Sequence, residues 1–237
     1  MNPNHANLYL IPSTIGTEDP ETILPIVTLE IIRSLQYFIV ENEKTARAFL
    51  KSCKITIPQA DLVIVELDKH DPRQDMNKML KPARNGSPIG LLSEAGCPAV
   101  ADPGAKVVAN AHRLGIPVKP LVGPSSILLA LMGSGLEGQR FIFHGYLPID
   151  KPERIKAITK IEKDSMQWNV TQIFIEAPYR NNSMLKDLLS TCNPDTRLCI
   201  AIDLHTETQD IRMMHVRDWK KQIPELHKRA TVFLLLY

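Results

Sequence analysis

Residues 89–104 read I-G-L-L-S-E-A-G-C-P-A-V-A-D-P-G, and they constrain the fold more than any other segment of the chain. The apolar run ends abruptly at Ser93 and Glu94, and glycines and prolines follow at once. This pattern predicts a buried parallel strand that leads into a tight loop. Open α/β sheets bind ligands in such loops, at the carboxyl ends of their strands. A second loop of the same character, residues 121–126, follows shortly after, so the two loops predict a small-molecule cleft.

Apolar runs alternate with amphipathic stretches along the whole chain, which predicts an α/β fold. We expect strands at residues 8–11, 37–40, 62–66, 89–92, 116–121, 141–143, 172–176, 198–202, 208–216 and 231–236. We expect helices at residues 23–35, 43–51, 71–81, 102–114, 125–131, 152–164 and 182–191. A Gly-Pro break, followed by a change in the pattern, predicts two domains, residues 1–121 and 122–237.

Composition narrows the class of protein. The 237 residues carry a formal net charge of +2, so no global basic field indicates a nucleic-acid partner, although a local patch would suffice. The four cysteines are scattered without a C-x-x-C pair, which favours reduced thiols in a cytosolic protein. The first residues lack the pattern of a signal peptide, and no apolar run is long enough for a membrane span. We therefore expect a cytoplasmic protein without a membrane anchor.

Several common catalytic motifs are missing from the sequence. It contains no Walker A motif, G-x-G-x-x-G, H-E-x-x-H or G-x-S-x-G, and its histidines do not follow metal-ligand spacing, so we expect no metal. The glycines and prolines around Glu94 have a purely structural interpretation as turn formers. A carboxylate at a strand's end, beside glycines that let a ligand approach the backbone, also suits recognition of amino or hydroxyl groups. Glu94 favours this second interpretation.

Other polar residues near the predicted strand ends have two interpretations each. Ser125 and Ser126 cap a helix in one interpretation and offer hydroxyl and N–H groups to a ligand in the other. Residues 41–44, E-N-E-K, are either a solvated helix start or part of a catalytic site. Glu176 and Arg180 form either a local ion pair or a substrate contact. His144 follows an apolar run and is expected to be packed.

Five stretches, taken in order, resemble the tetrapyrrole methylase superfamily, also called class III S-adenosylmethionine-dependent methyltransferases. They are L-Y-L-I-P-S-T-I-G (8–16), S-E-A-G-C-P-A-V-A-D-P-G (93–104), P-L-V-G-P-S-S-I-L-L-A-L (120–131), R-F-I-F-H-G-Y-L-P (140–148) and I-F-I-E-A-P-Y-R (173–180). Within the superfamily, the chain is most similar to bacterial methyltransferases that act on a ribose 2'-hydroxyl of small-subunit ribosomal RNA. The second and third stretches, at this spacing, are highly specific.

The resemblance implies two α/β domains with a ligand cleft between them, S-adenosylmethionine as the cofactor, and a homodimer. It implies ribosomal RNA, or the small ribosomal subunit, as substrate. The implied cofactor-binding residues are Pro12, Ser93, Glu94, Ala95, Gly96, Pro98, Pro124, Ser125, Ser126, Gly145, Ala230 and Thr231. The implied substrate-binding residues are Lys44, Glu176 and Arg180.

The chain departs from the ribosomal enzymes mainly on the side expected to face RNA. Their A-E-D-T-R is V-E-N-E-K here (40–44), and their A-R-E-L-T-K is A-I-D-L-H-T (201–206). Lysine does not replace the bidentate fork of arginine. A hydroxyl nucleophile profits from a general base, and Glu43 and Glu41 are the candidates because both follow a cleft-forming strand. Transfer without a base is the alternative.

Two other functions remain open on the sequence. One is a methyltransferase of the same fold that acts on a small molecule such as a tetrapyrrole. The absence of the G-x-G-P-G-D first loop that tetrapyrrole enzymes usually carry argues against it. The other is a non-catalytic paralogue that binds S-adenosylmethionine, which the altered V-E-N-E-K stretch keeps open.

Overall fold

Five short strands form a parallel sheet in the first half of the chain. The computed structural model describes residues 5–16, 19–68 and 74–237. The strands of this sheet, in spatial order, are β3 (Val63–Glu66), β2 (Tyr37–Val40), β4 (Ile89–Leu92), β1 (Leu8–Ile11) and β5 (Val118–Pro120). All of their pairings are parallel. The carboxyl ends of neighbouring strands therefore lie at one edge of the sheet.

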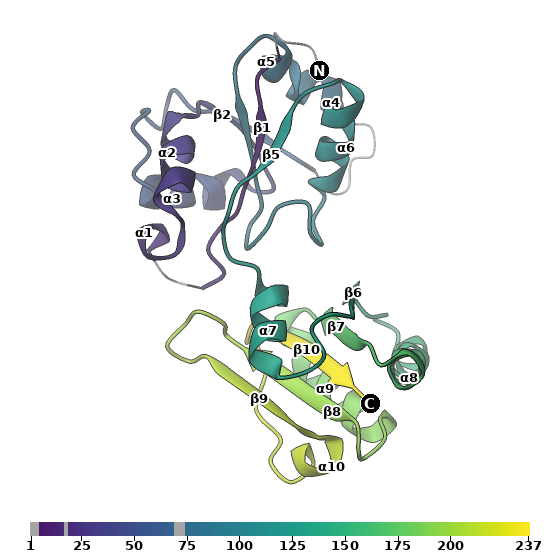
Figure 1. The fold of residues 1–237 in the computed structure, drawn as a ribbon. Coiled ribbons are helices and arrows are strands. Elements are labelled where there is room, and N and C mark those ends of the chain that lie inside the picture. Colours follow the sequence, from purple (N-terminus) through teal and green to yellow (C-terminus); the bar gives the residue numbers. More distant parts are fainter. Residues whose placement is uncertain (1–4, 17–18, 69–73) are drawn as a thin grey trace. The chain divides into compact units, whose positions relative to one another are not determined.

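Helices pack on both faces of this sheet, as is usual for parallel strands (Figure 1). One face carries α1 (Pro20–Ile23), α2 (Ile26–Ser34) and α3 (Glu43–Ser52), and the other carries α4 (Met76–Met79), α5 (Lys81–Arg84) and α6 (Ala105–Arg113). Along each strand, alternate side chains enter different cores. Phe38 and Val40 pack with the first group, whereas Ile39 packs with the second.

The second half of the chain forms a mixed sheet. Its strands, in spatial order, are β6 (Phe141–Tyr146), β7 (Thr171–Ile175), β10 (Thr231–Leu236), β8 (Arg197–Ile202) and β9 (Asp210–His215). The helices here are α7 (Ser126–Ser134), α8 (Lys151–Trp168), α9 (Asn181–Thr191) and α10 (Val216–Trp219). Strand β6 runs parallel to β7, and the other pairs are antiparallel. Side chains from α8, α9 and α10 pack on one face in a single core.

The chain thus divides into two compact units, Met1–Ser125 and Ser126–Tyr237. The predicted α/β fold is confirmed, and all of the predicted strands are present with small shifts at their ends. Within the described residues, no helix combines the length and apolar character that a membrane crossing requires.

Two predicted helices differ from the structure. The helix expected at residues 23–35 is divided into α1 and α2, because Leu24 is extended and Pro25 caps the second helix. A residue before proline avoids the α region, which explains the break. The helix expected from Asp71 begins instead at Met76, where the Asp75 side chain accepts hydrogen bonds from the first-turn N–H groups. The expected cap at Asp71 and the proline at position 72 lie outside the described residues.

Candidate active site

Three neighbouring strands of the first unit end at the same edge and place polar residues there. Pro12 follows β1, Ser93 follows β4 and Glu41 follows β2. The registers pair Ile11 with Leu92 and Val40 with Leu92, so the three following segments start at one level. This is the edge at which open α/β sheets bind ligands.

Hydrogen bonds join the loop after β4 to the segment after β1. Ser13 Oγ donates to the Ser93 carbonyl oxygen at 2.6 Å, and Ser13 N donates to the Gly96 carbonyl oxygen at 2.9 Å. Ser93 Oγ also donates to Gly96 O, at 3.1 Å. Ser13 and Ser93 are both buried. The start of the loop is therefore fixed by two hydrogen bonds from Ser13 and by one bond within the loop itself.

This network gives a prediction for Ser13→Ala. The substitution leaves the buried Ser93 carbonyl without the Ser13 hydroxyl donor, so we expect the free energy of unfolding of the first unit to fall by about 1–2 kcal/mol. Urea denaturation followed by circular dichroism measures the change. Ser34→Ala is the matched control, because the Ser34 hydroxyl donates to a helical carbonyl at an exposed position. We expect the control to change stability by less than about 0.5 kcal/mol. Equal effects of the two substitutions would contradict the role of Ser13.

The turn before α7 closes on the same two segments. A Cβ built on Gly123 would lie 2.2 Å from Pro12 Cγ, so only glycine allows this approach. Gly96 has a φ of +68°, and its backbone lies close to the Pro124 carbonyl oxygen, to which the Cys97 thiol donates at 3.4 Å. Burial raises the pKa of Cys97, which favours the neutral thiol that this hydrogen bond uses. The two glycine-containing loops singled out in the sequence therefore meet within the first unit.

The other predicted cofactor-binding residues of these loops differ in exposure. Gly96 and Pro98 are buried, whereas Glu94 and Ala95 are exposed at the tip of the loop. Pro124 and Ser125 are partly buried at the end of the first unit. Ser126 is the first residue of α7, in the second unit.

The two candidate bases after β2 have different surroundings. Glu41 Oε1 accepts a hydrogen bond from the Glu94 backbone N–H at 3.3 Å, which brings its carboxylate to the loop after β4. The Glu43 carboxylate instead pairs with Arg47 one helical turn later, with 2.7 Å between Glu43 Oε1 and Arg47 Nε. Lys44 lies exposed in the first turn of α3. Of these side chains, Glu41 is the one that contacts the predicted ligand loop.

The second unit has a comparable edge. The carboxyl ends of β6 and β7 and the start of β10 lie together there, because β6 and β7 are parallel and β10 is antiparallel to β7. Gly145 lies in β6 at an irregularity in the register, and Glu176 follows β7 directly. Thr231 opens β10, after the exposed Ala230. Gly145, Glu176 and Thr231 therefore share one sheet edge, with Ala230 directly before it.

Glu176 and Arg180 form the local ion pair that the sequence allowed. Arg180 Nη2 lies 2.6 Å from Glu176 Oε1, and the Glu176 side chain is only 1% exposed. Sequence reasoning missed Asn181, which is fully buried and donates from Nδ2 to the Arg229 carbonyl oxygen. Among the described residues, Glu176 Oε2 and Asn181 Oδ1 are buried acceptor atoms that receive no hydrogen bond. The sequence E-A-P-Y-R-N (176–181), which directly follows an apolar strand, was the pattern from which Asn181 could have been identified.

A buried ion pair that the sequence did not indicate supports the segment after Gly145. The Arg154 guanidinium contacts the Asp187 carboxylate at 2.6 Å, and both side chains are almost fully buried. Arg154 also donates to the carbonyl oxygens of Pro148 and Ile149. It therefore ties the end of that segment to α8 and α9. Within the described part of the chain, no group of three or more side chains is arranged to hold a metal ion.

Comparison with curated proteins gives relatives of one kind. A protein of Micromonospora olivasterospora named ribosomal RNA small subunit methyltransferase I is 33% identical over 181 residues. The alignment covers 76% of this chain and 54% of that protein. The protein of the same name from Bacillus subtilis (strain 168) is 32% identical, and the alignment covers 77% of this chain and 57% of that protein. The chain therefore spans little more than half of the length of these two relatives. The Vibrio cholerae relative is 28% identical, and the alignment covers 97% of this chain and 76% of that protein.

Solved structures show the same fold. Uroporphyrin III C-methyltransferase from Thermus thermophilus gives a TM-score of 0.59 at 17% identity and covers 97% of each chain. Diphthine synthase gives a TM-score of 0.65 at 15% identity, with 98% of this chain and 89% of that chain covered. A scan against protein-family models finds no match.

Proposed function

We propose that this chain, which is similar to the ribosomal RNA small subunit methyltransferases I and has the fold of the tetrapyrrole methylases, methylates a ribose 2'-hydroxyl of small-subunit ribosomal RNA. The methyl donor in this proposal is S-adenosylmethionine. The observation that carries the proposal is the joined pair of loops at the carboxyl ends of β1 and β4, closed by the turn at Gly123.

The residues present fit such a cofactor. The approach of Gly123 to the Pro12 ring leaves no room for a side chain at position 123, so this position offers backbone groups alone. Glu94 and Ala95 are exposed at the tip of the joined loop, and a carboxylate there suits the amino and hydroxyl donors of the cofactor. We propose that Pro12, residues 93–98 and residues 124–126 hold the cofactor.

In the second unit, we propose Gly145, Ala230 and Thr231 as further cofactor contacts. They share the sheet edge described above with Glu176, and Arg180 is held there by its ion pair. We propose that Glu176 and Arg180, together with Lys44 of the first unit, act on the substrate side.

When bound, the cofactor would supply a methyl group on a sulfonium; the C–S bond would break as the bond to the acceptor oxygen forms, and the neutral thioether would be the leaving group. The protein's contribution is to position the acceptor hydroxyl in line with that group, and correct positioning can lower the barrier by ~7–11 kcal/mol. Glu41 accepts the proton of the hydroxyl in this proposal, because its carboxylate lies against the loop that carries Glu94. Glu43 is the less suitable base because Arg47 already binds its carboxylate.

The test uses small ribosomal subunits from cells that lack this protein. The purified protein is incubated with the subunits and methyl-tritiated S-adenosylmethionine, and the RNA is digested to nucleosides. We expect the label in a single 2'-O-methylated nucleoside. Label that appears only in a small-molecule fraction of a cell extract would support the alternative of a metabolite methyltransferase. Cofactor binding without transfer to any fraction would support a non-catalytic paralogue.

The same proposal includes the assembly and the location of the protein. A ribosomal substrate implies a cytoplasmic protein, and the family resemblance supports a homodimer. Light scattering should then give a mass of twice 26.6 kDa. A mass of 26.6 kDa at micromolar concentration would contradict the dimer.

A further inference from the structure

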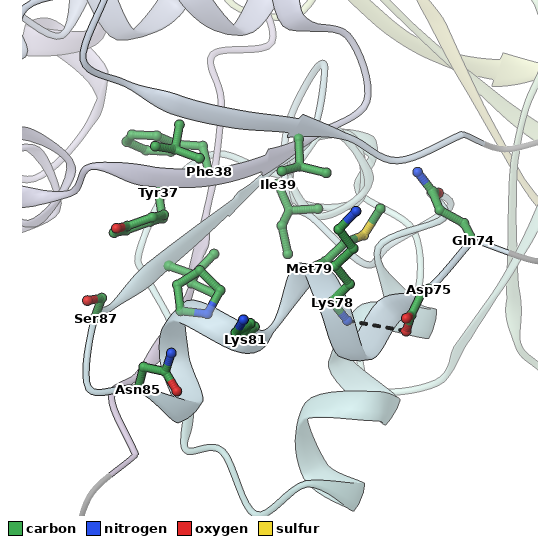
Figure 2. A pocket seen from close by; sticks show the side chains of 14 residues that line it. Tyr37, Phe38, Ile39, Gln74, Asp75, Lys78, Met79, Lys81, Asn85 and Ser87 are labelled. Atoms are coloured by element: carbon green, nitrogen blue, oxygen red, sulfur yellow. Dashed lines mark hydrogen bonds between the residues drawn. The ribbon is translucent and has the colours of Figure 1, made fainter.

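A pocket of about 800 Å³ lies on one face of the first unit's sheet, beside β2 and β3 (Figure 2). Figure 2 shows the aromatic and aliphatic side chains of β2 on one side of the pocket, and Lys78, Lys81 and Asn85 on the other. Its volume falls in the range that binds small molecules, about 300–1,000 Å³. The residues that line it do not include any of the proposed cofactor-binding residues.

The pocket exists because the helices over this part of the sheet are short. Helices α4 and α5 are four residues each, and Pro82 lies in the first turn of the second. Parallel sheets are normally covered on both faces. Here Val63 and Val65, which point to the same side of β3, remain 43% and 37% exposed. An apolar floor formed by Val63 and Val65, beside the buried Ile39, is therefore accessible to a ligand.

Two positive charges lie opposite this floor. Lys78 and Lys81 are exposed, and neither forms an ion pair with a described residue. Asp75, the acidic residue of the pocket, is engaged as the cap of α4 through the N–H groups of Asn77 and Lys78. Lys78 and Lys81 thus offer two ammonium groups to an anion, and among the described lining residues Asp75 is the one carboxylate, whose Oδ1 is already bonded to the two N–H groups of α4.

Polar side chains without charge complete the lining. Asn85 and Ser87 lie at one end and offer both donors and acceptors beside the apolar floor. Gln74 also lines the pocket, but its amide already bonds to the Glu66 carbonyl oxygen and the Asp68 N–H group. A fatty acid would use the floor and the lysines but would make no use of the Asn85 and Ser87 side chains. A planar base with a polar edge and a phosphate uses all three features.

We propose that this pocket binds a nucleotide. The base packs against Val63 and Val65, its polar edge bonds to Asn85 or Ser87, and the phosphate lies at Lys78 and Lys81. The nucleotide has two possible sources, a free nucleoside monophosphate or one nucleotide of the RNA substrate. The second source rests on the proposed function, whereas the first does not.

The test is calorimetric titration of the whole protein, without cofactor, against each nucleoside 5'-monophosphate and against a single-stranded RNA oligonucleotide. The double variant Lys78→Ala/Lys81→Ala removes both phosphate contacts, and we expect binding at least about tenfold weaker. Val65→Phe fills the pocket and should abolish binding. The control Lys106→Ala/Lys119→Ala removes two exposed lysines of the same unit that do not line the pocket, and it should bind within about twofold of the native protein.

Each outcome decides the proposal. Binding of a monophosphate that the pocket variants lose supports a free nucleotide, and binding of the oligonucleotide alone, lost in the same variants, supports an RNA source. The proposal is overturned if no probe binds up to millimolar concentration, or if both pocket variants bind as the native protein does. Methyl transfer to ribosomal subunits is measured separately. Transfer without pocket binding refutes only the pocket, and pocket binding without transfer refutes only the proposed reaction.

Discussion

We expect Glu41→Gln to lower the turnover of methyl transfer about 100-fold, because general-base catalysis contributes ~100- to 10,000-fold. Glutamine keeps the size of the side chain and an oxygen that accepts the Glu94 N–H bond, so the loop after β4 should stay in place. Cofactor affinity should therefore change by less than about twofold. Turnover and affinity are measured by labelled transfer and by calorimetry.

The matched control for this prediction is Glu43→Gln. It removes the carboxylate two residues away, which is paired with Arg47 and 46% exposed. An exposed pair at this spacing contributes only ~0.3–0.5 kcal/mol to stability, so we expect turnover close to that of the native protein. A large loss in Glu43→Gln, with native turnover in Glu41→Gln, would reverse the assignment of the base. Native turnover in both variants would show that transfer needs no base from this strand end.

The second large effect is expected from Gly123→Ala. The added methyl group would lie 2.2 Å and 2.5 Å from two ring carbons of Pro12, and the stiff proline ring has little freedom to move aside. Overpacking of this kind costs about 1–3 kcal/mol. The turn and the segment after β1 must separate, so we expect S-adenosylmethionine to bind at least about tenfold more weakly.

Gly138→Ala is the control for that substitution. A Cβ at Gly138 meets no atom within 4 Å, and its backbone is not in the left-handed region. Cofactor affinity should therefore be unchanged in the control. If Gly123→Ala binds the cofactor as the native protein does, the close approach of the turn to Pro12 has no part in the site.

Much of the fold follows from local patterns in the sequence. The apolar run at β4 and the polar loop after it predicted a parallel strand and a ligand edge, because a short apolar run bounded by glycine and proline is typical of a buried strand. The division at Leu24 and Pro25 was missed because both short helices share one helical spacing of apolar residues. The Glu43–Arg47 pair lies at a spacing that sequence alone can recognise.

Contacts between residues that are far apart in the chain could not be predicted from the sequence. Glu41 and Glu94 are far apart in the chain, and only the placement of β4 beside β2 brings them together. The Arg154–Asp187 pair likewise depends on how α8 packs against α9. The pocket over β2 and β3 depends on the shortness of α4 and α5, whereas the sequence pattern favoured one longer helix there.

The most direct test of the account is calorimetric titration of the protein with S-adenosylmethionine and with its demethylated product, S-adenosylhomocysteine. The account predicts that both compounds bind at one site per chain, compete with one another, and lose affinity in Gly123→Ala but not in Gly138→Ala. An absence of heat and of any thermal stabilisation with either compound would contradict it.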